Sequence, residues 1–410
     1  MERKKIEILD QIIKENPKDE IPHKSFFDFF HYQKNPTFFT DASIFDKTEY
    51  FEIKKKFMDK KEFSKIEKSS MGSMLGMAIG DAMGAPVEFQ PLSYTYDTIK
   101  DMGEKTRGNF DLKPGQWTDD TSMGLCLADS LIEKKGQFKP RDIMMRFLLW
   151  WFYGYNNAFR FDNKRRHSVG LGGNISGSFR TYLATYGQNE YTIYGNKETS
   201  GNGSIMRNAA IPICYYRDGK SALYYAGLQS KITHQGDEAS GCCQLLTFII
   251  VKILNGGQLK DVLNNLGNEF QSDCCKSVYC LANSEQEGND KNRNWNWKDQ
   301  NFKYSEERAR DNPGYIGSYC MDGLAMALHV LYYTNTFVDA ILKVVNLRGD
   351  ADSVGSVVGQ IAGAYYGIDN IPKEWIYTIN KWDGNEIALR GYILCHLMEN
   401  NLPNEYVKQP

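Results

Sequence analysis

Apolar residues recur at intervals of three and four along most of the 410-residue chain, which is the spacing of an α-helix. Sustained alternation of apolar and polar positions, which is typical of strands, is scarce. An amphipathic run after residue 121 places Met123, Leu127 and Leu131 on one face. Further helices are predicted over residues 141–152, 179–186, 239–254, 318–332 and 337–346. We therefore predict an all-α domain.

Two of the expected helices carry glycine at every fourth position. Each glycine inside a helix costs ~1 kcal/mol relative to alanine, and residues four apart form ridges that pack together. We therefore expect these two helices to touch. The second run contains Gln360 and is shorter than the ~20 apolar residues of a membrane span, which favours a soluble contact. The glycines are Gly72, Gly76, Gly80 and Gly84 in one helix and Gly355, Gly359, Gly363 and Gly367 in the other.

An acidic cluster with a hydroxyl precedes each of two helices. Such residues are ordinary N-caps, and their charge suits the positive end of a helix dipole. Adjacent carboxylates repel each other, however, unless a cation or a proton lies between them. The local pattern is therefore compatible with two roles for these residues, helix capping and cation binding. The clusters are Thr118, Asp119 and Asp120, and Asp350, Asp352 and Ser353.

The donor atoms of these clusters are all oxygens, because neither histidine nor cysteine occurs at such spacing. Hard oxygen ligands favour Mg²⁺ or Mn²⁺ over zinc. Six or more donors exceed what one magnesium ion usually takes from a protein, so a pair of ions sharing a carboxylate fits better. Contact between the glycine ridges would bring Asp81 and Glu88 towards the clusters, with Asp81 either part of the site or a buried structural acid.

Charge and cysteine content limit the remaining function classes. The formal net charge of −2 argues against a dedicated nucleic-acid binder, whose surface would be strongly basic. The nine cysteines form no paired CxxC set, and we interpret them as reduced thiols in a cytoplasmic protein. The charged N-terminus has no apolar core of signal-peptide length. Neither export by a signal peptide nor a membrane location is expected.

Residues 1–70 differ in composition from the rest of the chain and form an expected N-terminal helical extension. A short amphipathic helix at its start and a charged helix over 47–68 flank an aromatic-rich stretch at 23–32. We assign residues 71–400 to one compact multi-helix domain. Within it, the polar, asparagine-rich segment 284–312 is interpreted as an insertion or a long surface loop.

Two glycine-rich loops occupy residues 169–178 and 199–208. Backbone N–H groups in such loops can bind phosphate before a helix, although glycine loops more often only turn the chain. Neither loop has the spacing of the Walker or the dinucleotide-binding motif. His234 precedes the helix over 239–254 and is either a cap, a satisfied surface group or a functional residue.

Five motifs taken together resemble the ADP-ribosylglycohydrolase family, which includes the dinitrogenase reductase-activating glycohydrolase. They lie, in this order, at residues 80–89, 117–121, 201–207, 233–234 and 348–353. The resemblance covers roughly residues 71–395. It implies an all-α fold, a site with two magnesium ions, and hydrolysis of ADP-ribose from a modified protein side chain, commonly arginine or serine.

The resemblance also implies roles for individual residues. Glu88 matches an acid with an assigned catalytic role, and either Glu88 or Asp119 could take the proton of a water. Ser353 stands where the family usually has threonine, which keeps a hydroxyl for a metal. The implied metal ligands are Thr118, Asp119, Asp120, Asp350, Asp352 and Ser353. The implied ADP-ribose-binding residues are Gly170, Gly172, Gly173, Asn174, Ser176, Gly201, Asn202, Gly203, Ser204, Met206 and His234.

Three functions are therefore expected as alternatives. The first is a hydrolase that releases ADP-ribose from a modified protein, with arginine as the favoured linkage. The second is an immunity module that neutralises an ADP-ribosyltransferase by contact through residues 1–70. The third is a hydrolase of free ADP-ribose conjugates. Aromatic residues of the extension would pack on a partner or cap the domain's own core; they are Phe26, Phe27, Phe29, Phe30, Tyr32, Phe38 and Phe39.

Overall fold

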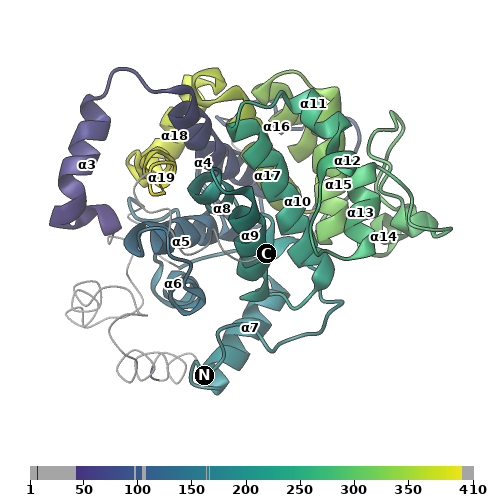
Figure 1. Ribbon diagram of the computed structural model, residues 1–410, viewed down its shortest axis with the longest axis horizontal. Helices are drawn as coiled ribbons and strands as arrows, with labels where there is room; N and C mark the ends of the chain where they lie inside the picture. The colour runs from purple at the N-terminus through teal and green to yellow at the C-terminus, as the bar shows by residue number, and fades with distance from the viewer. Residues whose placement is uncertain are drawn as a thin grey trace.

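The fold is organised around two long helices, α4 (Lys65–Gly84) and α17 (Ala351–Tyr366), which lie side by side in opposite directions. The computed structural model describes Glu7 and residues 43–398, apart from 97, 104–107, 163 and 166. Helix α19 packs on α4, while α10, α15 and α16 pack on α17 (Figure 1). The short helix expected at the start of the chain and the aromatic stretch 23–32 lie outside the described residues.

The described part of the chain is helical and contains no strand, only two isolated β-bridges. This confirms the all-α prediction. None of these helices is long and apolar enough to cross a membrane. The other α-helices are α3 Thr48–Asp59, α5 Asp119–Glu133, α6 Pro140–Tyr153, α7 Gly173–Ala184, α8 Ala210–Tyr215, α9 Gly219–Lys231, α10 Asp237–Leu254, α11 Leu259–Asn264, α12 Leu266–Glu269, α13 Lys276–Asn283, α14 Glu306–Asp311, α15 Cys320–Tyr333, α16 Phe337–Val345, α18 Lys373–Asp383 and α19 Glu386–Leu394. Short 3-10 helices are η1 Ile44–Asp46, η2 Ala85–Val87, η3 Asn202–Ser204, η4 Lys291–Arg293 and η5 Ile368–Asn370.

The two glycine ridges face each other across the α4–α17 contact, as their spacing predicts. A Cβ atom built on Gly76 would overlap the carbonyl oxygen of Gly359, and one built on Gly80 would overlap that of Gly355. Backbone therefore packs directly on backbone, with no room for a side chain between the helices. Because the helices run in opposite directions, the end of α4 at Gly84 lies against the start of α17 at Asp352.

Two expected helices have different bounds in the structure. The single helix predicted over 47–68 is divided into α3 and α4. Ser64 caps α4: the backbone N–H of Glu67 donates to Ser64 Oγ, and the Glu67 carboxylate accepts from the Ser64 N–H at 2.6 Å. This reciprocal capping box starts a new helix. The helix predicted over 179–186 begins earlier, inside the glycine loop at Gly173, and ends at Ala184, although glycine is an unfavourable residue in a helix.

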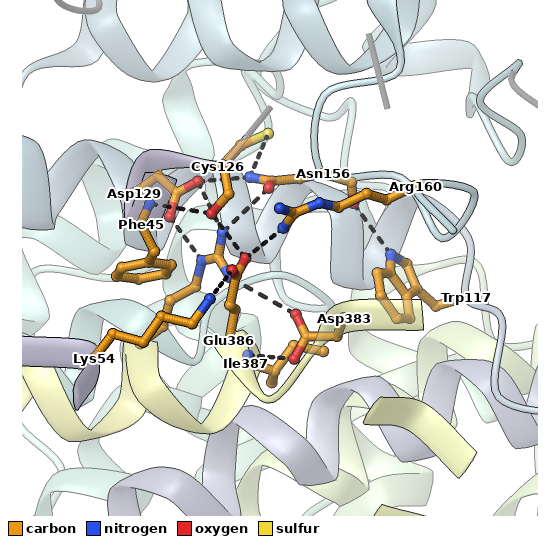
Figure 2. A network of polar contacts seen from close by, with 12 residues as sticks. Phe45, Lys54, Trp117, Cys126, Asp129, Asn156, Arg160, Asp383, Glu386 and Ile387 are labelled. Carbon is orange, nitrogen blue, oxygen red and sulfur yellow. Dashed lines mark hydrogen bonds and ion pairs between the residues drawn. The ribbon is translucent and has the colours of Figure 1, made fainter. Parts of the chain in front are cut away.

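The residues just before α4 are attached to the domain. Lys54 Nζ and Arg160 Nη1 each donate to the Glu386 carboxylate at 2.8 Å (Figure 2). Phe45 is buried, and the Arg390 guanidinium lies 5.0 Å from the centre of its ring. Arg390 also donates to Asp129 at 2.7 Å. Residues 43–59 therefore cover the surface formed by α5 and α19.

The polar segment 284–312 is well packed despite its composition. Trp295 and Trp297 are fully buried, and Trp297 Nε1 donates to the Leu281 carbonyl oxygen at 2.7 Å. Arg293 donates to Glu287 at 2.8 Å and also contacts Glu238. The two tryptophans anchor this segment to the helices beneath it.

We expect Gly76→Ala to destabilise the protein even though alanine favours helix. The added methyl group would meet a backbone carbonyl that cannot rotate away, so overpacking should cost about 1–3 kcal/mol. Gly227→Ala in α9 is the matched control, because its nearest neighbours are the side-chain ends of Gln244 and Ser240 at 3.1 Å. Thermal unfolding of both variants checks this. Equal melting temperatures would contradict the close backbone approach.

Candidate functional site

Three segments bring their acidic residues together where α4 ends and α17 begins. Asp81 belongs to the last turn of α4 and Glu88 directly follows η2. Carboxylate oxygens of Asp81, Asp120 and Asp352 lie within 4.8 Å of one another, and so do those of Glu88, Asp350 and Asp352. Both acidic clusters of the sequence thus meet in one place, with Asp352 common to the two groups.

Asp81 holds the start of α5 in position. Its carboxylate accepts hydrogen bonds from the backbone N–H groups of Thr118 and Thr121, both at 2.9 Å, and from both threonine hydroxyls at 2.9 and 2.6 Å. Burial raises the pKa of Asp81 to about 6, although these hydrogen bonds oppose the shift. Asp81 therefore supports the start of α5, and its carboxylate also lies within the group formed with Asp120 and Asp352.

The residues at the starts of α5 and α17 do not serve as ordinary caps. Thr118 and Asp350 occupy the N-cap positions, and neither side chain caps its helix. Thr118 Oγ1 instead lies 3.1 Å from Asp120 Oδ2 and 3.3 Å from Asp352 Oδ2. The Thr118 hydroxyl thus faces the acidic cluster, whereas Asp352 Oδ1 accepts a hydrogen bond from the Ser353 N–H of its own helix at 2.9 Å.

The electrostatics of the cluster are those of a site that accepts a cation. Burial, together with the charges of Asp350 and Asp119, raises the pKa of Glu88 to about 10. Burial and neighbouring carboxylates also raise the pKa values of Asp119, Asp120 and Asp352 well above their usual range. Glu88 Oε2 and Asp120 Oδ1 are buried and accept no hydrogen bond from the described residues. Unpaired, oxygen-only donors fit a hard metal ion.

A cavity of about 770 Å³ opens beside the acids. Asp119, Asp350 and Ser353 contribute to its wall, so the cluster has access to a bound molecule. Most of the predicted ligand-binding residues also line it: Gly170, Gly172, Gly173, Asn174, Gly201, Asn202, Gly203, Met206 and His234.

Two of the predicted binding residues, Ser176 and Ser204, are not among the residues that line this cavity. Ser204 is fully buried, and its hydroxyl accepts a hydrogen bond from Ser230 Oγ at 2.8 Å. It fastens η3 to the helix that precedes His234. The residues that precede Ser204 in the motif line the cavity, but spacing within a 3-10 helix cannot show which side chain points inward.

The first glycine loop approaches the acidic cluster more closely than a residue with a side chain could. Gly170 has a positive φ of 91°, and a Cβ atom there would overlap the Asp119 carboxylate. Gly172 and Gly173, at the start of α7, have open space around the Cβ position. Asn202 joins the second loop to the acids, because its Nδ2 donates to Asp350 Oδ2 at 3.0 Å.

An aromatic wall of the cavity was missed by the sequence analysis. Phe89 lies with its ring centre 5.1 Å from that of Tyr315 and 6.1 Å from that of Phe110. Trp151 and Ser318 complete this side. Phe89 could have been predicted to lie near the site because it directly follows Glu88. No periodic pattern in the sequence marks Phe110 or Tyr315.

The sequence model of the ADP-ribosylglycohydrolase family matches residues 64–402. The chain belongs to this family. It is therefore a hydrolase of ADP-ribose linkages. The glycohydrolase is 33% identical to the ADP-ribosylarginine hydrolase Tri1 of Pseudomonas putida (strain GB-1) over 313 residues, which are 75% of this chain and 73% of the relative.

Two further likenesses extend over most of the glycohydrolase. The ADP-ribosyl-[dinitrogen reductase] glycohydrolase of Rhodospirillum rubrum is 26% identical, with 77% of this chain and 91% of the relative covered. A solved structure, an ADP-ribosylglycohydrolase-related protein complex, superposes with a TM-score of 0.61 and 28% identity and covers 81% of this chain and 100% of that one. The fold and family predicted from the motifs are confirmed.

His234 lies at the inner wall of the glycohydrolase cavity and should stay neutral. Burial and the nearby Arg207 lower its pKa to about 3. Between that pH and the ordinary value of ~6.5, the unfolded chain binds a proton that the folded protein does not. The stability contributed by His234 should therefore decline as the pH falls through this window. NMR titration of the ring checks this, with the exposed His167 as a reference; protonation near pH 6.5 would contradict it.

Proposed function

We propose that this glycohydrolase is a magnesium-dependent enzyme that removes ADP-ribose from modified arginine side chains of proteins. The observation that carries the proposal is the buried acidic cluster with unpaired oxygens, which opens on a glycine-lined cavity. The cavity volume falls within the usual range of ~300–1,000 Å³ for ligand pockets. The likeness to an ADP-ribosylarginine hydrolase favours arginine as the linked residue.

Two Mg²⁺ ions, or Mn²⁺ in their place, would be held by the six residues at the starts of α5 and α17. Asp352 belongs to both groups of converging carboxylates, which suits a ligand shared by a pair of ions. When bound, the ions would offset the repulsion among the acids and supply positive charge for orienting ribose hydroxyls and water. The ligands proposed are Thr118, Asp119, Asp120, Asp350, Asp352 and Ser353.

The protein's own groups would then handle the proton and the leaving side chain. Cleavage at the anomeric carbon of ribose passes through an oxocarbenium-like state that nearby carboxylates stabilise. Either Glu88 or Asp119 would accept the proton of the attacking water, provided that bound cations offset the repulsion that raises the pKa values of both carboxyl groups. Asp119 lines the cavity, whereas Glu88 is not among the lining residues and lies with Asp350 and Asp352.

The glycine loops and the aromatic wall would bind the rest of ADP-ribose. The first N–H groups of α7 are free of side-chain caps, and the open space at Gly172 and Gly173 lets an anionic phosphate approach them. Phe89, Phe110 and Tyr315 also line the cavity and offer apolar surface to a ligand. A lining that combines polar groups with apolar surface is typical of a ligand pocket.

Release of ADP-ribose from a protein modified on arginine should require Mg²⁺ and stop in chelator. Asp352→Asn should reduce turnover by at least 10²-fold and abolish Mn²⁺ binding measured by calorimetry, because it removes a charge shared by both groups of acids. Asp237→Ala alters an exposed acid and should change neither. A substrate modified on serine, assayed in parallel, tests the linkage. Full activity of the enzyme in chelator would refute the metal assignment.

Ser353 provides a milder test of the same site. Its hydroxyl lines the cavity and lies 3.6 Å from Met206 Sδ. We expect Ser353→Thr to retain most activity because the hydroxyl is kept, and Ser353→Ala to lose Mg²⁺ affinity by about tenfold or more. Metal titrations of the two variants measure this. Equal affinities would show that the Ser353 hydroxyl is not a ligand.

A further inference from the structure

Three buried side chains form a hydrogen-bonded chain that ends at the cavity. Arg207 Nη2 donates to Thr233 Oγ1 at 2.8 Å, and the same oxygen lies 2.8 Å from His234 Nδ1. The exposed fraction is 0% for Arg207 and Thr233 and 1% for His234. All three are thus shielded from water that could exchange these hydrogen bonds.

The guanidinium of Arg207, the first group in this series of hydrogen bonds, is fixed in orientation. Arg207 Nε donates to Gln229 Oε1 at 3.1 Å, and Nη2 also donates to the Gln229 carbonyl oxygen at 3.0 Å. Gln229 is itself oriented, because its Nε2 donates to the Ser204 carbonyl oxygen at 2.9 Å. The guanidinium also stacks over Phe147, 4.5 Å from the ring centre. Since a guanidinium only donates, Thr233 Oγ1 must accept from it.

The hydroxyl hydrogen of Thr233 then determines which ring nitrogen of His234 carries a hydrogen. A hydroxyl has one hydrogen to donate, and within the described residues the only acceptor within hydrogen-bond distance is His234 Nδ1. If Nδ1 carried a proton instead, the buried hydroxyl hydrogen would have no partner, which is unfavourable. Nδ1 is therefore the acceptor, and a neutral ring must carry its hydrogen on Nε2.

The Nε2 atom faces the cavity at the second glycine loop. Cβ atoms built on Gly203 and Gly201 would lie 3.2 and 3.6 Å from it, so glycine leaves the approach open. No described residue forms a hydrogen bond with Nε2, although His234 lines the cavity wall. Nε2–H is therefore free to donate into the cavity, to water or to an acceptor oxygen of a bound molecule.

We infer that Arg207 and Thr233 are positioning residues that fix the tautomer of His234, so that Nε2–H is presented as a donor to an acceptor oxygen of ADP-ribose. The identity of the ligand rests on the proposed function, whereas the tautomer does not. Phosphate and ribose oxygens accept this hydrogen, and a ligand group able only to donate is rejected. Because the ring is oriented before binding, no hydrogen bond has to be rearranged when the ligand enters.

The tautomer is measured first, on the unmodified protein without ligand. Long-range ¹H–¹⁵N NMR spectra distinguish a protonated Nε2 from a protonated Nδ1, and a His234→Asn variant identifies the resonances. We expect His234 to carry its hydrogen on Nε2. A ring protonated on Nδ1 would overturn the inference, and this result requires neither activity nor any other variant to fold.

Thr233→Val then removes the hydroxyl with little change of shape, and Thr233→Ser restores it. In the valine variant we expect a mixture of tautomers, an ADP-ribose affinity lower by about tenfold, and a larger change in KM than in kcat. The serine variant should behave as the parent. Thr247→Val, which loses a buried hydroxyl bonded to Asn208 Nδ2 at 2.7 Å, is the control for general destabilisation.

The outcomes separate the two parts of the inference. An unchanged tautomer in Thr233→Val would show that Thr233 does not fix the ring. A changed tautomer with unchanged ADP-ribose affinity would show that Nε2–H does not contact the ligand. If the parent protein fails to bind ADP-ribose at all, the proposed function fails, while the tautomer measurement still decides the role of Arg207 and Thr233.

Discussion

Direct contact between the backbones of α4 and α17 is the constraint on which the rest of this molecule depends. Helical propensity is lost at four glycines in α4 and at three in α17, where Gly367, the fourth of the predicted ridge, instead ends the helix at a positive φ of 70°. In return, carbonyl oxygens of one helix occupy the space that side chains of the other would fill. The contact brings Asp81 next to Asp352. Asp81 in turn accepts hydrogen bonds from backbone N–H groups at the start of α5. The contact between α4 and α17 therefore also sets the position of Thr118 and its neighbours.

The resulting site is electrostatically unfavourable by itself. Several carboxylates lie buried within a few ångströms, and two of their oxygens have no partner among the described residues. A protein built only for stability would replace such a cluster with apolar groups. The function proposed above accounts for this unfavourable arrangement, because a bound cation and a substrate would offset the repulsion among the carboxylates. The surrounding structure stabilises it through contacts that lie elsewhere.

One such set of contacts lies behind the start of α5. Trp117 Nε1 donates to the Asn156 carbonyl oxygen at 3.2 Å, and Asn156 Nδ2 donates to Asp129 at 2.8 Å (Figure 2). Asp129 is paired with Arg390. Burial acts most strongly on the pKa of Asp129 and raises it, but the charges of Arg390 and Arg146 together with the hydrogen bonds from Arg390 and Asn156 outweigh burial and lower the pKa. Asp129 and Arg390 are thus paired with each other, in contrast to the acids of the proposed metal site. The network around Asp129 therefore stabilises the fold, whereas the acidic cluster is proposed to bind a ligand.

Local spacing in the sequence determined the helices, the glycine ridges and the composition of the acidic clusters, because each is a property of residues a few positions apart. Only the tertiary structure decided that Asp81 supports α5, since its partners Thr118 and Thr121 are about forty positions away. The aromatic wall at Phe89 and Tyr315 and the chain from Arg207 to His234 likewise join distant segments. Hydrogen-bond direction depends on which donors and acceptors meet in space, and no periodic pattern along one segment records that meeting.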